Sequence, residues 1–446
     1  MTRTPHPDSP HSADAADAEA NGRALLSVAI TEPVAPHLAP AAIQMPRMLR
    51  ALRYPGFRYF WAANFLSNTG TWMQNIAQGW LVLELTNSAF WLGVVGFAAS
   101  VPMLGFSLLG GVIADRVDRR RMMVRTQTAM MLFAFLLAAL TWLKIINVPL
   151  IVLLAFATGV AMSLNTPSYQ ALVPQLVPRE VLANAIGLNS AQYNMSRVIG
   201  PTLGGFAMHW FGAGGNFFLN GLSFLTLLAV LLRMRMPAPE LSDESATLWQ
   251  RLSDGFRYVY DNRVMAALLS AVGLASILGV PYLMFIPLFA RNILHVGERG
   301  FGLLMAFSGL GAFGAAITIA YFGKFRRSGK LVARAGSVFF VAVIAFTFSR
   351  SFALSAFLMA LAGYSMILMV ATVNTLLQHL AAEEMRGRVM SIYATAFLGF
   401  APVGSLIAGS LAGAVTAPYA IAGMSALGLV GIWALYFTQP ELRKLD

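Results

Sequence analysis

A row of uncharged polar side chains interrupts the first long apolar segment of the chain. Asn68, Thr71, Asn75 and Gln78 follow one another at intervals of three or four residues, so a helix places all four on one face. Trp72 lies beside this row. Amide and hydroxyl groups hold a small molecule by hydrogen bonds, while an aromatic ring adds apolar contact. We interpret the row as the wall of a binding cavity; for any single residue, hydrogen bonding between helices is the alternative.

Two later segments offer further polar groups. Asn165 and Asn374 each precede a threonine, at corresponding places in the two halves of the chain. We expect both asparagines to line the cavity, and Tyr169 and Gln378 to extend the same surface. A cavity that is polar, mostly uncharged and bordered by aromatic and methionine side chains suits an amphiphilic cargo.

Charged residues inside the apolar segments are few, and intramembrane charges mark functional sites. Arg197 lies well inside a segment and needs an anionic or carbonyl partner. Glu84 ends the first long apolar segment and is our candidate for carrying a coupling proton.

The residue types that bind metals or perform catalysis are missing or scattered. The chain has no cysteine and six histidines, and no histidine pair shows metal-binding spacing. No nucleophile, base and orienting group converge in the apolar segments, and no P-loop pattern for nucleotide binding occurs. We therefore expect no enzymatic activity, no cofactor and no bound metal.

The elements that position these residues follow from composition. Apolar residues make up 57% of the 446 residues and charged residues only 11%, against about 25% charged in soluble domains. The apolar residues form blocks of about 20, the length that spans a bilayer core as a helix. Twelve transmembrane helices are predicted, at 57–84, 89–114, 122–145, 148–173, 181–210, 214–233, 264–291, 299–322, 331–348, 353–380, 387–413 and 417–437.

The basic residues predict the orientation of these helices. The net charge is +12, but the lysines and arginines concentrate in every second loop. Lys144, Arg291, Arg299 and Arg350 are the basic residues of the opposite loops. The positive-inside rule then places both termini in the cytoplasm. The charge therefore sets the orientation of a multi-pass membrane protein, and does not indicate nucleic-acid binding.

A polar linker divides the helices into two sets of six. We predict an all-α membrane protein with two pseudo-symmetric six-helix bundles, as in alternating-access carriers. The expected domains are a disordered cytoplasmic tail (1–46), the N-terminal bundle (57–233), a cytoplasmic linker with an amphipathic helix (234–263), the C-terminal bundle (264–437) and a cytoplasmic tail (438–446).

The loop between the second and third predicted helices carries a motif. Its residues are Gly111, Asp115, Arg116, Arg119 and Arg120. They resemble the pattern G-x-x-x-D-R-x-G-R-R of the major facilitator superfamily, with Asp118 where that family usually has glycine. The resemblance implies a gate that latches the cytoplasmic side in the outward-facing state. A basic loop that merely sets topology is the alternative, but it does not account for the spacing of Gly111 and Asp115.

The fifth predicted helix carries a second motif, formed by Gly187, Arg197, Gly200, Pro201, Gly204 and Gly205. It resembles the antiporter motif of exporters in this superfamily, which implies efflux and a seal on the central cavity. A generic small-residue packing face is the alternative. One departure limits the comparison: Ala155 stands where many proton-coupled exporters have an arginine four residues before a glycine, here Gly159.

The motifs together resemble the branch of the superfamily that contains the enterobactin exporter and macrolide efflux proteins. The resemblance implies a monomeric secondary exporter in a bacterial inner membrane, which moves small amphiphilic, drug-like or siderophore-like molecules by alternating access. Proton antiport is the expected coupling. The alternatives are an importer or a lipid-flipping carrier of the same fold, and a non-transporting membrane sensor.

Overall fold

The computed structural model describes residues 47–116, 118–234, 256–322 and 328–443, with side chains for all of these except 47–48, 104–116, 398 and 442. Every regular element in these ranges is helical. The predicted tail 1–46 and most of the predicted linker lie outside the described residues. The domain boundaries therefore stay predictions.

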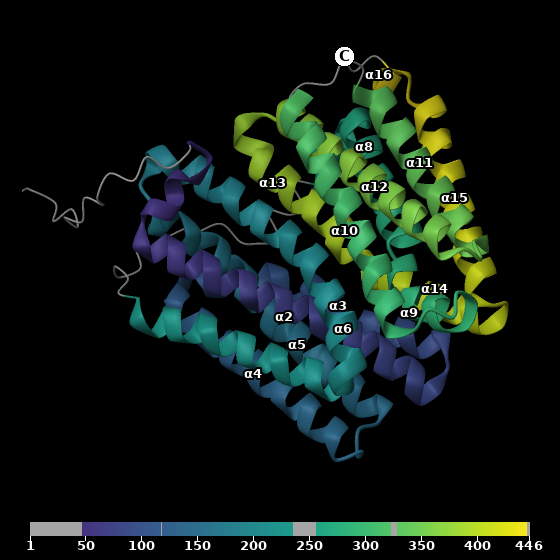
Figure 1. Cartoon of the computed structure of the whole chain (residues 1–446). Coiled ribbons are helices and arrows are strands. Elements are labelled where there is room, and N and C mark those ends of the chain that lie inside the picture. The colour runs from purple at the N-terminus through teal and green to yellow at the C-terminus, as the bar shows by residue number, and fades with distance from the viewer. Residues whose placement is uncertain (1–46, 117, 235–255, 323–327, 444–446) are drawn as a thin grey trace, which may run out of the picture. The chain divides into compact units, whose positions relative to one another are not determined.

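The first half of the chain forms one group of helices (Figure 1). In order these are η1 (Arg47–Arg53), α2 (Pro55–Thr86), α3 (Ala89–Arg116), α4 (Arg119–Trp142), α5 (Val148–Leu172), η2 (Val173–Leu176) and α6 (Arg179–Arg233).

The second half begins after helical residues 256–261. Its elements are α8 (Arg263–Leu274), η3 (Ala275–Gly279), α9 (Tyr282–Leu288), η4 (Phe289–Ile293), α10 (Gly297–Phe322), α11 (Ser328–Phe348), α12 (Phe352–Leu380), α13 (Glu383–Ala394), η5 (Thr395–Gly399), α14 (Ala401–Ala414), α15 (Ala417–Thr438) and α16 (Pro440–Arg443).

These elements make twelve spans. Nine helical stretches of the described chain are long and apolar enough to cross a membrane. One of them, α6, has 55 residues and reverses at Gly212, where φ is 65° and ψ is −175°, so it provides two spans. The remaining two are α3 and α2, and polar residues interrupt the apolar sequence of α2. The predicted all-α membrane fold is confirmed.

Side-chain caps and prolines set several helix ends. Asp118, Asn147 and Asn262 cap α4, α5 and α8 by accepting hydrogen bonds from backbone N–H groups of the first turn, which otherwise lack partners. In the seventh and eleventh spans the helix widens to π geometry at η3, η4 and η5. Such segments are common at functional sites.

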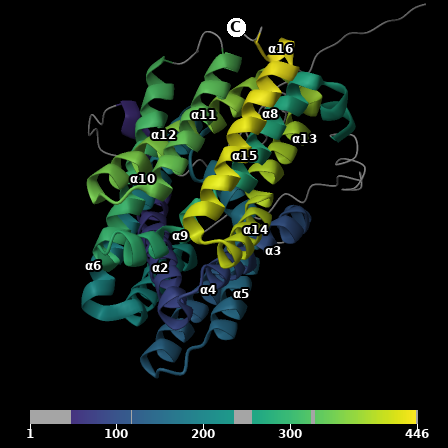
Figure 2. The same ribbon diagram turned by 90° about the vertical axis from the view of Figure 1, so that its right-hand side faces the viewer.

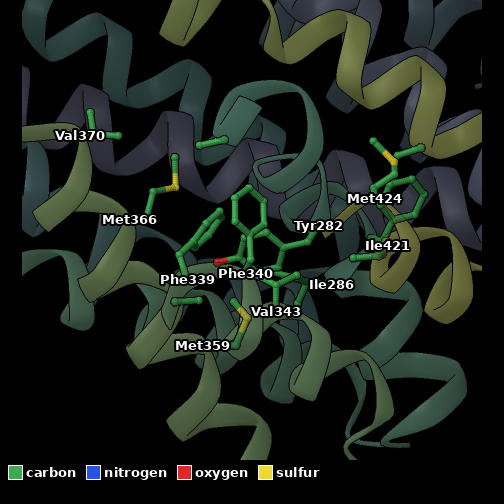
Figure 3. Close-up of a cluster of buried hydrophobic side chains, with 14 of the residues drawn as sticks. Tyr282, Ile286, Phe339, Phe340, Val343, Met359, Met366, Val370, Ile421 and Met424 are labelled. Atoms are coloured by element: carbon green, nitrogen blue, oxygen red, sulfur yellow. The ribbon is translucent and has the colours of Figure 1, made fainter. Parts of the chain in front are cut away.

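Aromatic and methionine side chains pack the second half (Figure 3). Tyr282 and Phe339 are buried side by side in this cluster. The ring centroid of Tyr282 lies 6.2 Å from that of Phe339 and 6.4 Å from that of Phe346. Phe289 contacts Phe346 at 4.9 Å. Because lipid tails are as apolar as these side chains, close packing rather than burial from water holds membrane helices together.

The two halves meet along two helix pairs, α6 with α10 and α3 with α14. We call the end where α2 begins the basic end, and the end where α2 finishes and α3 begins the opposite end. A Cβ on Gly93 would lie 2.6 Å from the carbonyl oxygen of Ser405, and one on Gly205 would lie 2.7 Å from that of Glu298. These backbone contacts lie toward the opposite end, and the paired groups of helices are seen from two sides in Figures 1 and 2.

Candidate functional site

The predicted polar row lies along one face of α2. Asn75 is exposed, and Asn68, Thr71 and Gln78 are half-buried. The Thr71 hydroxyl donates to the carbonyl of Ser67 one turn earlier, at 2.9 Å. Within the described part of the chain, the amides of Asn68, Asn75 and Gln78 have no hydrogen-bond partner. They are therefore available to another molecule.

The other polar residues of α2 serve helix packing. Asn64 donates to Gln192 of α6 at 3.0 Å, and Asn220 of α6 donates to Gln74 at 2.7 Å. Both α2 residues are buried. The same helix thus carries one polar face that binds α6 and another that stays open.

The open face cannot lie against lipid. An unpaired amide in hydrocarbon costs several kcal/mol, and polar residues within spans face a cavity or another helix. Asn68 and Asn75 lie in the middle of a 32-residue helix, far from both ends. The open face therefore indicates a polar space between the helices.

Trp72 lies next to this face. Its ring contacts that of Tyr193 of α6 at a centroid distance of 6.4 Å. A Cβ on Gly200 would lie 2.5 Å from the Cβ of Trp72, so the glycine allows the tryptophan to sit directly on α6. The ring pair gives the polar face an aromatic border.

Asn165 does not line a cavity in this conformation. Its side chain is buried and accepts hydrogen bonds from Thr126 at 3.1 Å and from Gln127 at 3.4 Å. It therefore joins α5 to α4, and the expectation for this residue is corrected. Tyr169 is also committed to packing: its hydroxyl accepts from Asn64 at 3.3 Å and its ring stacks on Phe60 at 5.7 Å.

Asn374 and Gln378 lie together near the basic end of α12. Asn374 is half-buried and Gln378 is exposed, and the amide of Gln378 donates to Asn374 at 2.7 Å. These two residues remain accessible, as the cavity hypothesis requires. The placement of both on the same cavity as the α2 row stays a prediction.

The loop motif is described in part. The structure describes the backbone of Gly111, Asp115 and Arg116, which completes α3, but not the side chains of Asp115 and Arg116. Arg120 donates from Nε to the carbonyl of Leu231 at 2.6 Å and from Nη2 to that of Leu232 at 2.7 Å. A cation at the carbonyl end of α6 is favoured by the helix dipole.

Asp118 and Arg119 flank this junction. Asp118 accepts from the backbone N–H groups of Arg120 and Arg121, at 2.9 and 3.2 Å. The residue that departs from the family pattern thus starts the next helix. Arg119, at the first position of α4, is half-buried.

The fifth-span motif divides its glycines between two neighbours. A Cβ on Gly204 would lie 3.0 Å from the Cα of Met73 of α2, whereas Gly205 lies against α10. Pro201 contributes its carbonyl oxygen, 2.5 Å from where a Cβ on Gly302 would lie. Gly187 has open space around it, so no neighbouring helix approaches closely at this position. The motif therefore joins the two halves around its Gly-Pro-x-x-Gly-Gly portion.

Arg197 lies within the same motif. It is half-buried and its guanidinium forms no hydrogen bond or ion pair in the described ranges. A cation in the middle of a span costs about 2.5–3.5 kcal/mol on insertion scales. The structure thus does not supply the partner that we expected for this residue.

Glu84 lies at the opposite end, away from the polar row. Its carboxylate is exposed and accepts a hydrogen bond from the indole of Trp80 at 3.1 Å. In this conformation it is open to the medium rather than enclosed between the helices.

Two polar contacts, which we call the clasp, join the halves at the opposite end. Arg291 donates to the carbonyl of Leu83 at 3.1 Å, and Asn292 donates to the side chain of Asn87 at 3.3 Å. Both donors belong to the π-helical segment η4. The sequence assigned Arg291 only to a loop, because no local spacing pairs residues so far apart in the chain.

The sequence pattern of the family described as transmembrane secretion effector, one of the major facilitator families, matches residues 48–446. The chain belongs to the major facilitator superfamily. It is therefore a multi-pass membrane transporter of small molecules and not an enzyme.

Relatives of this transporter match along nearly their whole length. The staphyloferrin A transporter of Staphylococcus aureus is 23% identical over 399 residues, covering 87% of this chain and 98% of the relative. The enterobactin exporter EntS of Citrobacter koseri is 27% identical over 381 residues, covering 84% and 90%. The predicted resemblance to the branch of the enterobactin exporter is confirmed.

Solved transporters share the fold. The nucleoside transporter NupG has a TM-score of 0.66 at 12% identity, covering 86% of this chain and 99% of that chain. A bacterial homologue of the human lysosomal transporter Spinster, in an inward-facing and occupied conformation, has a TM-score of 0.66 at 15% identity, covering 90% and 99%. At these identities the likeness concerns the fold alone.

Metal-binding residues do not gather in the described part of the transporter, where no group of three histidine or acidic side chains is close enough to hold an ion.

Proposed function

We propose that this transporter is a secondary active exporter that moves small amphiphilic, siderophore-like molecules out of the cytoplasm by alternating access. The observation that carries the proposal is the open polar face of α2. Asn68, Asn75 and Gln78 offer unpartnered amides in the middle of the membrane, and Trp72 with Tyr193 borders them. This combination of amides and rings suits an amphiphilic cargo.

The expected orientation in the membrane indicates which side of the transporter is closed in this conformation. If the positive-inside rule holds, the basic end faces the cytoplasm and the opposite end faces outward. The clasp and the Gly205–Gly302 contact then close the outer side. Cargo enters the polar space from the cytoplasm in this state, and leaves after the halves rock apart at the outer end.

The relatives support the class of cargo. One is named as an exporter of enterobactin and one as a transporter of staphyloferrin A. We infer a siderophore-like cargo for this transporter, whose fifth-span motif favours export. Multidrug export is the broader form of the same proposal.

A transport assay tests the direction. A deletion strain and an overexpressing strain of the source bacterium are compared for release of siderophores and for accumulation of fluorescent drugs. Export predicts that deletion raises cellular accumulation and overexpression lowers it. The opposite changes indicate an importer, and unchanged accumulation together with altered lipid asymmetry indicates a lipid-flipping carrier.

Proton antiport is the proposed coupling, because the fifth-span motif resembles that of antiporters and the chain shows no P-loop for ATP. Glu84 is the candidate proton carrier. In inside-out vesicles, collapsing the proton gradient with a protonophore should stop export. Glu84→Gln should abolish cargo-driven proton movement, whereas Glu441→Gln, at an exposed carboxylate of α16, should not. Unchanged export without a gradient would show that protons are not the coupling ion.

A further inference from the structure

Arg197 lies where the two halves meet inside the membrane. It is on α6, between Arg179 at the start of the helix and the reversal at Gly212. A Cβ on Gly309 of α10 would lie 3.0 Å from the carbonyl oxygen of Arg197. The arginine is therefore at the level where α6 touches the second half of the transporter.

No carboxylate of the described helices neutralises this cation. The acidic side chains that the structure describes lie at or near helix ends: Glu84, Asp118, Glu180, Asp261, Glu298, Glu383, Glu384 and Glu441. Arg197 forms no ion pair with any of them. Arginine stays protonated in proteins, so it cannot relieve the cost by losing its charge. A counter-ion from outside the described helices is needed.

Two buried hydroxyl groups lie near Arg197. Ser308 is next to Gly309 on α10, and the hydroxyl of Tyr282 lies within hydrogen-bonding reach of Ser308. Neither hydroxyl carries a negative charge, so they do not neutralise the guanidinium.

The arginine adjoins the α2 row. Tyr193 precedes it by one helical turn, so the two side chains share a face of α6. Tyr193 is 49% exposed, and its ring contacts that of Trp72. One cation, two aromatic rings and the amides of α2 thus border the same region.

We propose that Arg197 binds a carboxylate or similar oxyanion of the cargo, while Trp72 and Tyr193 hold its apolar or aromatic part. The inference rests on the proposed export of amphiphilic molecules and narrows them to anions. The guanidinium provides a planar fork of N–H donors that matches a carboxylate. Because Arg197 cannot give up its proton, it selects the charge of the cargo and does not carry the coupling proton.

Binding of a matched pair of probes tests the inference. The purified full-length transporter in lipid nanodiscs is titrated calorimetrically with 1-naphthoate and with 1-naphthamide, which share a ring system but differ in charge. Empty nanodiscs correct for partition into lipid. We expect naphthoate to bind about 10-fold more tightly, because a charge-assisted hydrogen bond is about twice as strong as a neutral one. Equal affinity of the wild-type protein for both probes overturns the proposal.

Variants locate the preference. Arg197→Gln should remove the preference for naphthoate and leave naphthamide binding unchanged, whereas Arg197→Lys should keep most of it. Arg125→Gln, at an exposed arginine of α4, is the matched control and should behave as wild type. Two results would contradict a site at Arg197. One is an equal loss of affinity for both probes in Arg197→Gln, and the other is loss of the preference for naphthoate in Arg125→Gln. Size-exclusion chromatography confirms that each variant is folded, and Arg197→Lys carries the test if Arg197→Gln is not.

The outcome is separable from that of the proposed function. The protein could prefer naphthoate through Arg197 and yet move no cargo in the accumulation assay. That result would contradict the proposed export and support the anion site. Conversely, the protein could export neutral drugs equally well with Arg197→Gln and bind naphthoate no better than naphthamide. That result would contradict the anion site and support export.

Discussion

Gln74 and Asn75 are adjacent in the chain but have different surroundings. Gln74 is buried and accepts a hydrogen bond from Asn220 at 2.7 Å. Asn75 is exposed and has no partner among the described residues. A helix turns by about 100° per residue, which is enough to move a side chain from the α6 contact to the open face.

This difference predicts opposite effects of the same substitution. Gln74→Leu leaves the Asn220 amide without its acceptor, which costs about 1–3 kcal/mol of stability, and should lower the melting temperature in a fluorescence-detected chromatography assay. Asn75→Leu removes no hydrogen bond and should leave the melting temperature unchanged while reducing export of the cargo. A stable, fully active Gln74→Leu protein, or an unstable Asn75→Leu protein, would contradict the division of α2 into two faces.

Spacing along one helix predicted the α2 row but could not name its partners. Asn68, Thr71, Asn75 and Gln78 share a face because helical geometry alone determines it. Asn165 was interpreted by the same reasoning, but Thr126 and Gln127 of another helix take up its oxygen. Contacts between helices decide which polar residues stay without a partner. The spacing of residues within one helix does not predict these contacts.

Gly212 determines how the fifth and sixth spans are connected. Its φ of 65° with ψ of −175° belongs to a region that is essentially restricted to glycine. Gly212→Ala should therefore cost about 1–3 kcal/mol and lower the melting temperature. Gly423→Ala is the control, because Gly423 lies inside α15 with open space around it. Alanine is favoured over glycine there by about 0.5–1 kcal/mol, so the control should not be destabilised.

Helix positions were predictable because the bilayer imposes a length on each apolar block. The first span was expected at 57–84 and α2 covers Pro55–Thr86; the tenth was expected at 353–380 and α12 covers Phe352–Leu380. The π-helical segments η3, η4 and η5 were not predicted. A single widened turn hardly changes the length or the hydrophobicity of a span, so neither property of the sequence predicts it.

The arrangement of the two halves follows from small residues at facing positions. Gly93 faces Gly409, and Gly205 faces Gly302, with backbones so close that any side chain would collide. The fifth-span motif singled out Gly205, but α10 as the neighbour of Gly205 could not be predicted from spacing within one helix. The contacts are direct and carry no ion pair in the described ranges, so they can separate and re-form without desolvating buried charge pairs.

Separation of the halves at the opposite end is the step that alternating access requires. The chain contains no cysteine, so an introduced pair can react only with itself. Asn87→Cys with Asn292→Cys replaces a contact of 3.3 Å between the halves. Oxidation should lock the clasp and stop export, and a reductant should restore it.

The matched control ties two positions within one half. Ser349→Cys with Ser355→Cys replaces a hydroxyl contact of 2.9 Å inside the second half, where rocking changes no distance. Oxidising this pair should therefore leave export intact. If the locked clasp still exports cargo, the halves need not part at this end and the rocking mechanism fails. If both pairs stop export, internal flexibility of the second half, rather than movement between the halves, limits transport.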